Sequence, residues 1–152
     1  MRRVVKKRKA GSRHGSRVTR HAPALVQVAA GLIFREGHYL IARRKAGTHL
    51  GGLWEFPGGK RETGESLEEC LRRELREELG VDVTPPVHVR VIRHDYRGKT
   101  VELHFFRCTI SRGEASALDC EEVRWVTPGE LSDYEFPPAD RPLIEALRNS
   151  DE

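Results

Sequence analysis

The sequence of 152 residues lacks the features that define several common protein classes. No apolar run approaches the ~20 residues that a membrane-spanning helix needs, and no hydrophobic stretch follows the basic N-terminus as it would in a secretory signal. The three cysteines, Cys70, Cys108 and Cys120, are widely spaced and form no C-x-x-C pair. This pattern argues against a disulfide scaffold or a zinc site, so we expect a cytoplasmic protein without membrane contact.

Acidic residues are absent from the first 20 positions, which hold nine Lys/Arg. The other 132 residues contain 18 Lys/Arg and 23 Asp/Glu, so the net charge of +4 originates in this basic segment. Like charges without apolar periodicity predict a disordered tail over residues 1–22, followed by a single domain over 23–152. The tail is either an arm that contacts nucleic acid or a leader without a role, and it has no aromatic residue for base stacking.

Hydrophobic patterning predicts strands followed by a helix, more strands and a closing helix. A helix should begin at Ser66, where Ser66 and Glu69 match a capping box, and should end at Gly80. The closing helix is expected over Ala139–Arg148. Strands are expected over residues 25–34, 38–44, 87–92, 101–110 and 123–126. This order favours an α+β or α/β layered domain.

Three glutamates of the first predicted helix lie on one of its faces. Glu74, Glu77 and Glu78 have i, i+3 and i+4 spacing, at which like charges destabilise an isolated helix. A cation between them would remove this repulsion. Carboxylate oxygens suit Mg²⁺ or Mn²⁺, and Mg²⁺ prefers a few carboxylates together with waters and substrate phosphates.

A solvent-exposed helix with ion pairs is the alternative interpretation of this segment. Glu68–Arg72 and Glu69–Arg73 are favourable i,i+4 pairs that account for part of the charge. The preceding loop favours a binding site, because the adjacent glycines Gly58-Gly59 allow a ligand to approach the backbone closely.

The segment from residue 59 to residue 81 resembles the Nudix box, G-x5-E-x7-R-E-U-x-E-E-x-G-U, in which U is a bulky aliphatic residue. Every defined position is filled, by Gly59, Glu65, Arg73, Glu74, Leu75, Glu77, Glu78, Gly80 and Val81. Simple residue frequencies give a chance match of about one in a million. Residues 55–60 (EFPGGK) are similar to the entry of the box in MutT-type members, and residues 136–142 (FPPADRP) to their base-recognition loop.

The resemblance implies a Nudix fold, an α/β/α sandwich of the α+β class with a mixed sheet between helices and a loop-helix-loop catalytic motif. It also implies Mg²⁺-dependent cleavage of a nucleoside diphosphate linked to another moiety. The metal ligands would be Glu74, Glu77, Glu78 and the carbonyl of Gly59, with Glu65 and Arg73 bracing the site through an ion pair. The general base stays open between Glu74 and a later carboxylate, for which the candidates are Asp119, Glu121 and Glu122.

Four residues are candidates for substrate binding through the same resemblance: Arg44, Phe56, Lys60 and Asp140. Arg44 could instead be an exposed hairpin charge, and Phe56 could be a core residue. MutT has asparagine where Asp140 stands, and an ionised aspartate only accepts hydrogen bonds, which suits the donor edges of guanine and cytosine. Asp140 could alternatively cap the last helix.

We therefore predict a MutT-type pyrophosphohydrolase that converts oxidised or non-standard (d)NTPs, such as 8-oxo-dGTP, to the nucleoside monophosphate and pyrophosphate, acting as a monomer or homodimer on a small nucleotide. The alternative substrates are CTP or dCTP, a nucleotide sugar, a dinucleoside polyphosphate and capped RNA. A non-catalytic nucleotide sensor is disfavoured because all box glutamates are present.

Overall fold

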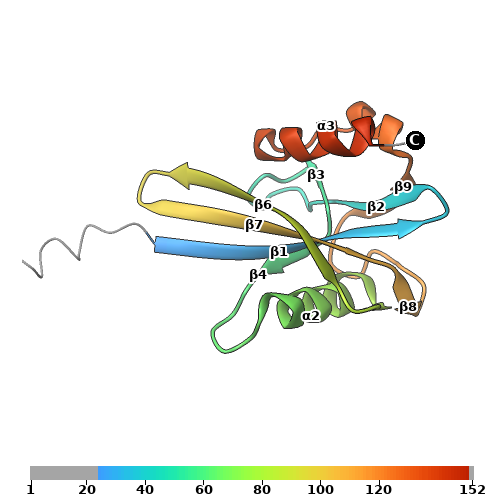
Figure 1. Ribbon diagram of the computed structural model, residues 1–152, viewed down its shortest axis with the longest axis horizontal. Helices are drawn as coiled ribbons and strands as arrows, with labels where there is room; N and C mark the ends of the chain where they lie inside the picture. The colour runs from blue at the N-terminus through green and yellow to red at the C-terminus, as the bar shows by residue number, and fades with distance from the viewer. Residues whose placement is uncertain (1–23, 151–152) are drawn as a thin grey trace, which may run out of the picture.

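The computed structural model describes residues 24–150, so the expectation about a disordered tail over 1–22 lies outside the described residues. A mixed sheet lies between helix α2 on one face and helix α3 with two short 3-10 helices on the other (Figure 1). This arrangement confirms the predicted α+β sandwich. Within this part of the chain, no helix is long and apolar enough to cross a membrane.

Seven strands form the main sheet: β1 (Ala24–Arg35), β2 (His38–Arg43), β3 (Trp54–Glu55), β4 (Gly58–Lys60), β6 (Val87–Tyr96), β7 (Lys99–Cys108) and β9 (Glu122–Val126). A separate pair joins β5 (Asp82–Val83) to β8 (Ile110–Arg112). The helices are α2 (Leu67–Leu79) and α3 (Arg141–Asn149), and the 3-10 helices are η1 (Pro128–Asp133) and η2 (Pro138–Asp140).

Strand β1 is the centre of the sheet because it pairs with three other strands. It runs parallel to β7 over its first ten residues and antiparallel to β2 at its C-terminal end. On its other edge, Val28, Ala29 and Ala30 pair with the three residues of β4. The glycine pair of β4 is therefore held directly against the middle of the sheet.

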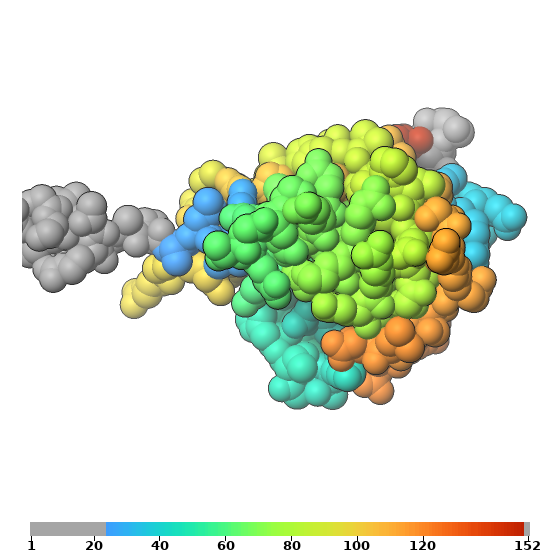
Figure 2. All heavy atoms as spheres, turned by 90° about the horizontal axis from the view of Figure 1, so that it is seen from below, coloured from blue at the N-terminus to red at the C-terminus, as the bar shows by residue number. Residues whose placement is uncertain are grey.

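Side chains from both faces of the sheet form two hydrophobic layers. Leu71, Leu75 and Leu79 of α2, spaced four residues apart, are fully buried against one face and form the inner side of the helix. On the opposite face, Phe56 and Phe105 pack with residues of α3 and η1. Figure 2 shows the α2 side, where the segment between β2 and β3 meets the segment after β8 beside the helix. The helix that carries the predicted site is thus anchored by its leucines.

Several predicted elements have different bounds in the structure, and the strand expected over 87–92, for example, continues to Tyr96. The closing helix begins at Arg141 rather than Ala139, because residues 138–140 form the 3-10 turn η2, in which the Asp140 N–H donates to the Pro137 carbonyl at 3.0 Å. The strand predicted over 101–110 ends at Cys108, and Ile110 belongs to β8. The short strands β3, β4, β5 and β8 were not predicted, since two or three residues carry no periodic signal.

Candidate active site

Helix α2 begins and ends at the residues that its sequence predicts. The Ser66 side chain accepts a hydrogen bond from the Glu69 N–H, and the Glu69 carboxylate accepts one from the Ser66 N–H. Gly80 terminates the helix in the left-handed conformation with φ 73°, which glycine adopts without steric cost. These local signals fix the position of the box glutamates along the helix.

The glycine pair brings the backbone of β4 against both the sheet and the helix. A Cβ atom on Gly58 would lie 1.9 Å from the Ala29 carbonyl oxygen, so no larger residue fits there. A Cβ atom on Gly59 would lie 2.3 Å from Cδ of Glu74. The Glu74 carboxylate therefore lies directly over Gly59, in space that the missing side chain leaves free.

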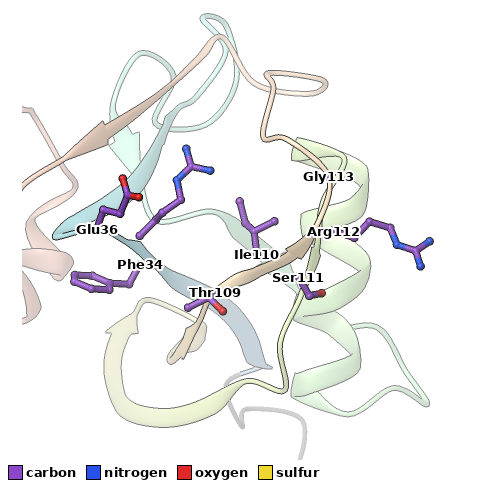
Figure 3. Close-up of a pocket in the computed structure, with 8 residues that line it drawn as sticks. Phe34, Glu36, Thr109, Ile110, Ser111, Arg112 and Gly113 are labelled. Atoms are coloured by element: carbon purple, nitrogen blue, oxygen red, sulfur yellow. The ribbon is translucent and has the colours of Figure 1, made fainter.

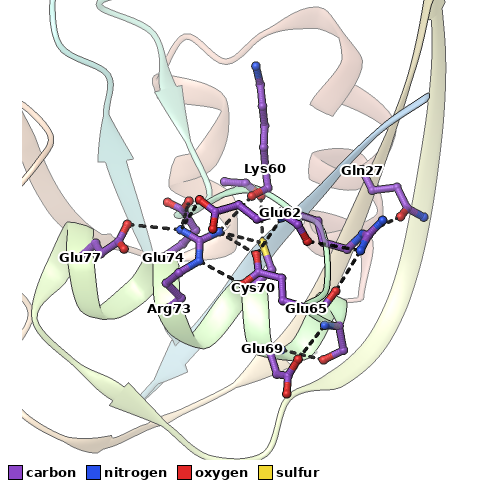
Figure 4. A network of polar contacts seen from close by, with 12 residues as sticks. Gln27, Lys60, Glu62, Glu65, Glu69, Cys70, Arg73, Glu74 and Glu77 are labelled. Atoms are coloured by element: carbon purple, nitrogen blue, oxygen red, sulfur yellow. Dashed lines mark hydrogen bonds and ion pairs between the residues drawn. The ribbon is translucent and has the colours of Figure 1, made fainter. Parts of the chain in front are cut away.

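Arg73 is the centre of a network of carboxylates (Figure 4). Its guanidinium donates to both carboxylate oxygens of Glu65, at 3.1 and 2.8 Å, to Oε2 of Glu74 at 2.9 Å and to Oε1 of Glu77 at 3.4 Å. It also donates to the Lys60 carbonyl at 3.1 Å. The Arg73 guanidinium lowers the pKa of Glu65 to about 2, with help from the Glu62 N–H. Glu65 and Arg73 thus form an ion pair that holds the loop and helix together.

Glu78 is a buried carboxylate with an unmet hydrogen-bonding capacity. Its Oε1 atom has no hydrogen-bond partner within the described part of the chain. Burial, together with the nearby Glu55 and Glu74 carboxylates, raises its pKa to about 9, against a hydrogen bond from the Gly58 backbone. Burial likewise raises the pKa of Glu74. A buried carboxylate of this kind lowers the stability of the fold unless a hydrogen-bond donor or a cation pairs with it.

The donor set around Gly59 fits a divalent cation of the Mg²⁺ type. Glu74 and Glu78 present oxygen atoms, and the Gly59 carbonyl, which accepts a hydrogen bond from the Cys70 thiol at 3.4 Å, lies beside Glu74. Glu77 lies further out, with 58% of its side chain exposed. No group of three His, Cys, Asp or Glu side chains among residues 24–150 is preassembled as a metal site. The protein would thus contribute a partial set of ligands, as Mg²⁺ commonly uses.

The candidate base-binding residues lie on the opposite face of the sheet or at its edge. Phe56 is buried and contacts Phe136 at 5.3 Å between ring centroids, so it is part of the core. Arg44 forms an ion pair of 2.9 Å with Glu55 and is not a free surface charge. The Lys60 side chain points away from the Arg73 network (Figure 4).

Asp140 is the most deeply buried charged residue of the described chain as a whole, with 7% exposure. It stands at the N-cap position of α3, but its side chain makes no capping hydrogen bond and its backbone is helical. The capping alternative is therefore wrong. Because η2 runs directly into α3, Asp140 does not adopt the extended conformation of an N-cap residue. Burial raises the pKa of Asp140 to about 7, and Glu55 contributes to this.

Sequence reasoning missed Glu55, which connects the two groups of candidates. Its carboxylate is near enough to Glu78 and Asp140 to raise the pKa of both. Its own pKa is raised by burial and lowered by Arg44. Glu55 is part of the segment that precedes the box. Its partner Arg44 becomes apparent only from the pairing of β3 with β2.

Asp119 is better placed for the site than the other two late carboxylates. Its backbone N–H donates to the Glu78 carbonyl at 3.2 Å, and its side chain forms a 2.9 Å ion pair with Lys45. Glu122 pairs instead with Arg124, and the Glu121 backbone binds the Arg43 carbonyl. Asp119 also contributes to the raised pKa of Glu78.

A hollow of about 480 Å³ lies away from these residues, between the end of β1 and strand β8 (Figure 3). Phe34, Thr109 and Ile110 line it, and the Arg112 side chain points out of it. None of the predicted site residues contributes to this hollow. It is therefore separate from the acidic cluster.

Comparison with known proteins matches the chain to one family model and to relatives that are named as nucleotide pyrophosphohydrolases or diphosphatases. Residues 29–146 match the family model described as NUDIX domain. The CTP pyrophosphohydrolase of Escherichia coli K12 is 38% identical over 123 residues, covering 81% of this chain and 91% of that protein. The 8-oxo-dGTP diphosphatase of Proteus vulgaris is 41% identical over 90 residues, covering 59% and 80%. The solution structure of the E. coli ORF135 protein superposes with a TM-score of 0.73 at 36% identity, covering 84% and 91%.

Proposed function

The chain belongs to the Nudix family of hydrolases, and from this premise we propose that it is a MutT-type nucleoside triphosphate pyrophosphohydrolase. Its reaction would convert oxidised or non-standard (d)NTPs to the nucleoside monophosphate and pyrophosphate. Family members generally use a divalent metal ion, and we propose Mg²⁺ or Mn²⁺ here. The observation that carries the proposal is the buried, unpartnered Glu78 oxygen beside Glu74 and the glycine pair.

In the proposed mechanism, Glu74, Glu78 and the Gly59 carbonyl would hold the cation, and the more exposed Glu77 is a further candidate ligand. A bound divalent cation supplies neutralisation of phosphate charge and orientation of the attacking water. Arg73 and Glu65 keep Glu74 over Gly59, so that its oxygens stay in place. The proton of the water passes to a nearby carboxylate, for which Glu74 and Asp119 are the candidates.

The nucleobase would be recognised around Asp140, with Phe56 and Arg44 as the neighbouring candidates. A protonated Asp140 can both donate and accept a hydrogen bond, as asparagine does, whereas the ionised form only accepts. A pKa of about 7 makes both forms available near neutral pH. This supports a pocket that accepts oxidised guanine, for which the relative from P. vulgaris is named.

Hydrolysis of CTP or dCTP is the second candidate function. The E. coli relative at 38% identity is named CTP pyrophosphohydrolase, and an ionised Asp140 suits the 4-amino group of cytosine. Nucleotide sugars, dinucleoside polyphosphates and capped RNA are further alternatives. The basic segment, through which RNA would be contacted, lies outside the described residues, and deleting residues 1–20 tests that contact.

A substrate panel tests the proposal. We expect pyrophosphate release from 8-oxo-dGTP with Mg²⁺, measured beside dGTP, dCTP, CTP and dATP. Glu68→Gln is the matched control, because Glu68 is an exposed glutamate on the same helix and should leave turnover unchanged. Activity on ADP-ribose or a nucleotide sugar, without turnover of any triphosphate, would refute the proposal.

We also propose that the enzyme acts in the cytoplasm, where its nucleotide substrates occur. All three cysteines are free and buried, as is usual in a reducing compartment.

A further inference from the structure

Arg61 connects the Nudix loop to strand β1 by its side chain. Its Nε atom donates to Oε1 of Gln27 at 2.9 Å. Its Nη1 atom donates to the backbone carbonyls of Glu65 at 2.9 Å and Glu62 at 3.4 Å. Figure 4 shows these contacts on the side of the network that faces β1. One guanidinium thus closes the turn before α2 and ties it to the sheet.

Gln27 fits this place because its amide has a donor and an acceptor. While Oε1 accepts from Arg61, Nε2 donates to Oε1 of Glu102 on β7 at 3.1 Å. Glu102 is itself held by an ion pair with Arg93 and by a 3.1 Å contact with His104. A glutamate at position 27 would repel Glu102, and an apolar residue would bind neither neighbour.

The contacts continue from Gln27 to the candidate metal ligand. Arg61 fixes the backbone carbonyl of Glu65, and the Glu65 carboxylate receives Arg73. Arg73 in turn donates to Glu74, which lies over Gly59. Gln27 itself touches none of the candidate ligands. Any influence of Gln27 on the candidate ligands must therefore pass through Arg61 and the ion pair of Glu65 and Arg73.

We propose that Gln27 is a positioning residue that holds the Nudix loop, through Arg61, in the geometry in which Glu74 can bind a divalent cation. The proposal rests on the proposed function. Neither Gln27 nor Arg61 occupies a defined position of the box. The fold does not need the side chain, because the Arg61 N–H still donates to the Gln27 carbonyl at 2.8 Å and Val28 still pairs with Lys60.

Three variants test the proposal: Gln27→Met, Gln27→Glu, and the double variant Gln27→Glu/Glu102→Gln. The first removes both hydrogen bonds, and the second places two carboxylates together. The double variant restores the hydrogen bond in the opposite direction, because the amide at position 102 can donate to the carboxylate at position 27. Each is measured for the Mn²⁺ dissociation constant by calorimetry, for kcat and KM with 8-oxo-dGTP, and for Tm.

We expect both single variants to bind Mn²⁺ about tenfold more weakly and to lose about tenfold in kcat, the low end of what outer-shell changes cost at metal sites. The KM for nucleotide should change less than about twofold, because the base-binding residues are untouched. The double variant should recover most of the Mn²⁺ affinity and kcat. Thr100→Val removes a hydrogen bond from β7 to Asp95 on β6, away from Gln27, and should behave as wild type.

Unchanged Mn²⁺ affinity in Gln27→Met would overturn the proposal, as would a loss that the double variant does not recover. A loss that appears only together with a large fall in Tm would also overturn it, since the side chain would then support the fold in general. Wild-type protein that binds Mn²⁺ but cleaves no triphosphate would refute the proposed function alone. The Mn²⁺ constants of the variants would still decide the role of Gln27.

Discussion

Replacing Glu78 by glutamine should stabilise the metal-free protein while it destroys hydrolysis. The Glu78 carboxyl is buried beside Glu55 and Glu74, and one of its oxygens has no partner. Glutamine has nearly the same shape but carries no charge. The substitution therefore removes the cost of holding a carboxylate in this place and, with it, a candidate ligand.

The size of the gain follows from the pKa of Glu78. The unfolded chain releases the proton near the ordinary pKa of 4.5, whereas the folded protein keeps it up to about 9. Between these values, wild-type stability falls as pH rises, by up to about 1.4 kcal/mol per pH unit, which reaches about 3 kcal/mol at pH 7. Glu55 and Glu74 share the same surroundings, so we expect a gain of about 1 to 3 kcal/mol from removing one titratable carboxyl of the three.

Chemical unfolding in EDTA measures this gain, at several pH values between 5 and 8. The difference between Glu78→Gln and wild type should be near zero at pH 5, grow with pH, and correspond at pH 7 to a Tm increase of roughly 3–10 °C. Turnover of 8-oxo-dGTP with Mg²⁺ should fall at least 10²-fold. Glu77→Gln is the control, because its mostly exposed side chain should change stability by less than about 0.5 kcal/mol. If the free energy of unfolding depended on pH in the same way for Glu78→Gln and wild type, burial of this carboxylate would not lower the stability, which would refute the reasoning.

Two further substitutions and a pH profile probe the neighbouring contacts. Gly59→Ala places a Cβ atom 2.3 Å from Glu74 Cδ, so turnover should fall at least about tenfold while circular dichroism stays unchanged; wild-type turnover would contradict the close contact. Asp140→Asn should alter the ratio of kcat/KM for 8-oxo-dGTP and dCTP more than it alters kcat. In wild type this ratio should change around pH 7, where Asp140 loses its proton, and in Asp140→Asn it should not; equal profiles would exclude Asp140 from base recognition.

Helix α2 could be predicted from the sequence because all its determinants are local. The capping box of Ser66 and Glu69 and the repeat of Leu71, Leu75 and Leu79 lie within one short segment. The ion pair between Glu65 and Arg73 also joins residues that are only eight positions apart. The cap and the leucine spacing depend on local helix geometry, whereas the ion pair was expected from the resemblance to the Nudix box.

The surroundings of the acidic cluster could not be predicted, since they depend on the order of strands in the sheet. Glu55 reaches Arg44 through the pairing of β3 with β2, and Asp119 reaches the end of α2 from a loop forty residues later in the chain. The parallel pairing of β1 with β7 joins Gln27 to Glu102 across 75 positions. No periodic pattern in the sequence encodes these registers.

The exposure of the individual box glutamates could not be predicted from their spacing either. The spacing of Glu74, Glu77 and Glu78 predicts one shared face, yet Glu77 is more than half exposed while Glu78 is buried. Glu78 lies against the Gly58 backbone and beside residues 118–119, whereas the Glu77 carboxylate pairs with Arg73 at the surface. The three carboxylates therefore differ in burial although their spacing is regular.

Dependence of hydrolysis on a divalent cation is the most direct test of the proposed site. Purified protein is treated with EDTA, and pyrophosphate release from 8-oxo-dGTP is followed as Mg²⁺ is returned. We expect turnover to vanish with EDTA and to return in wild type and in Glu68→Gln, but not in Glu74→Gln. Hydrolysis that persists in excess EDTA would show that the carboxylates of α2 do not act by holding a cation.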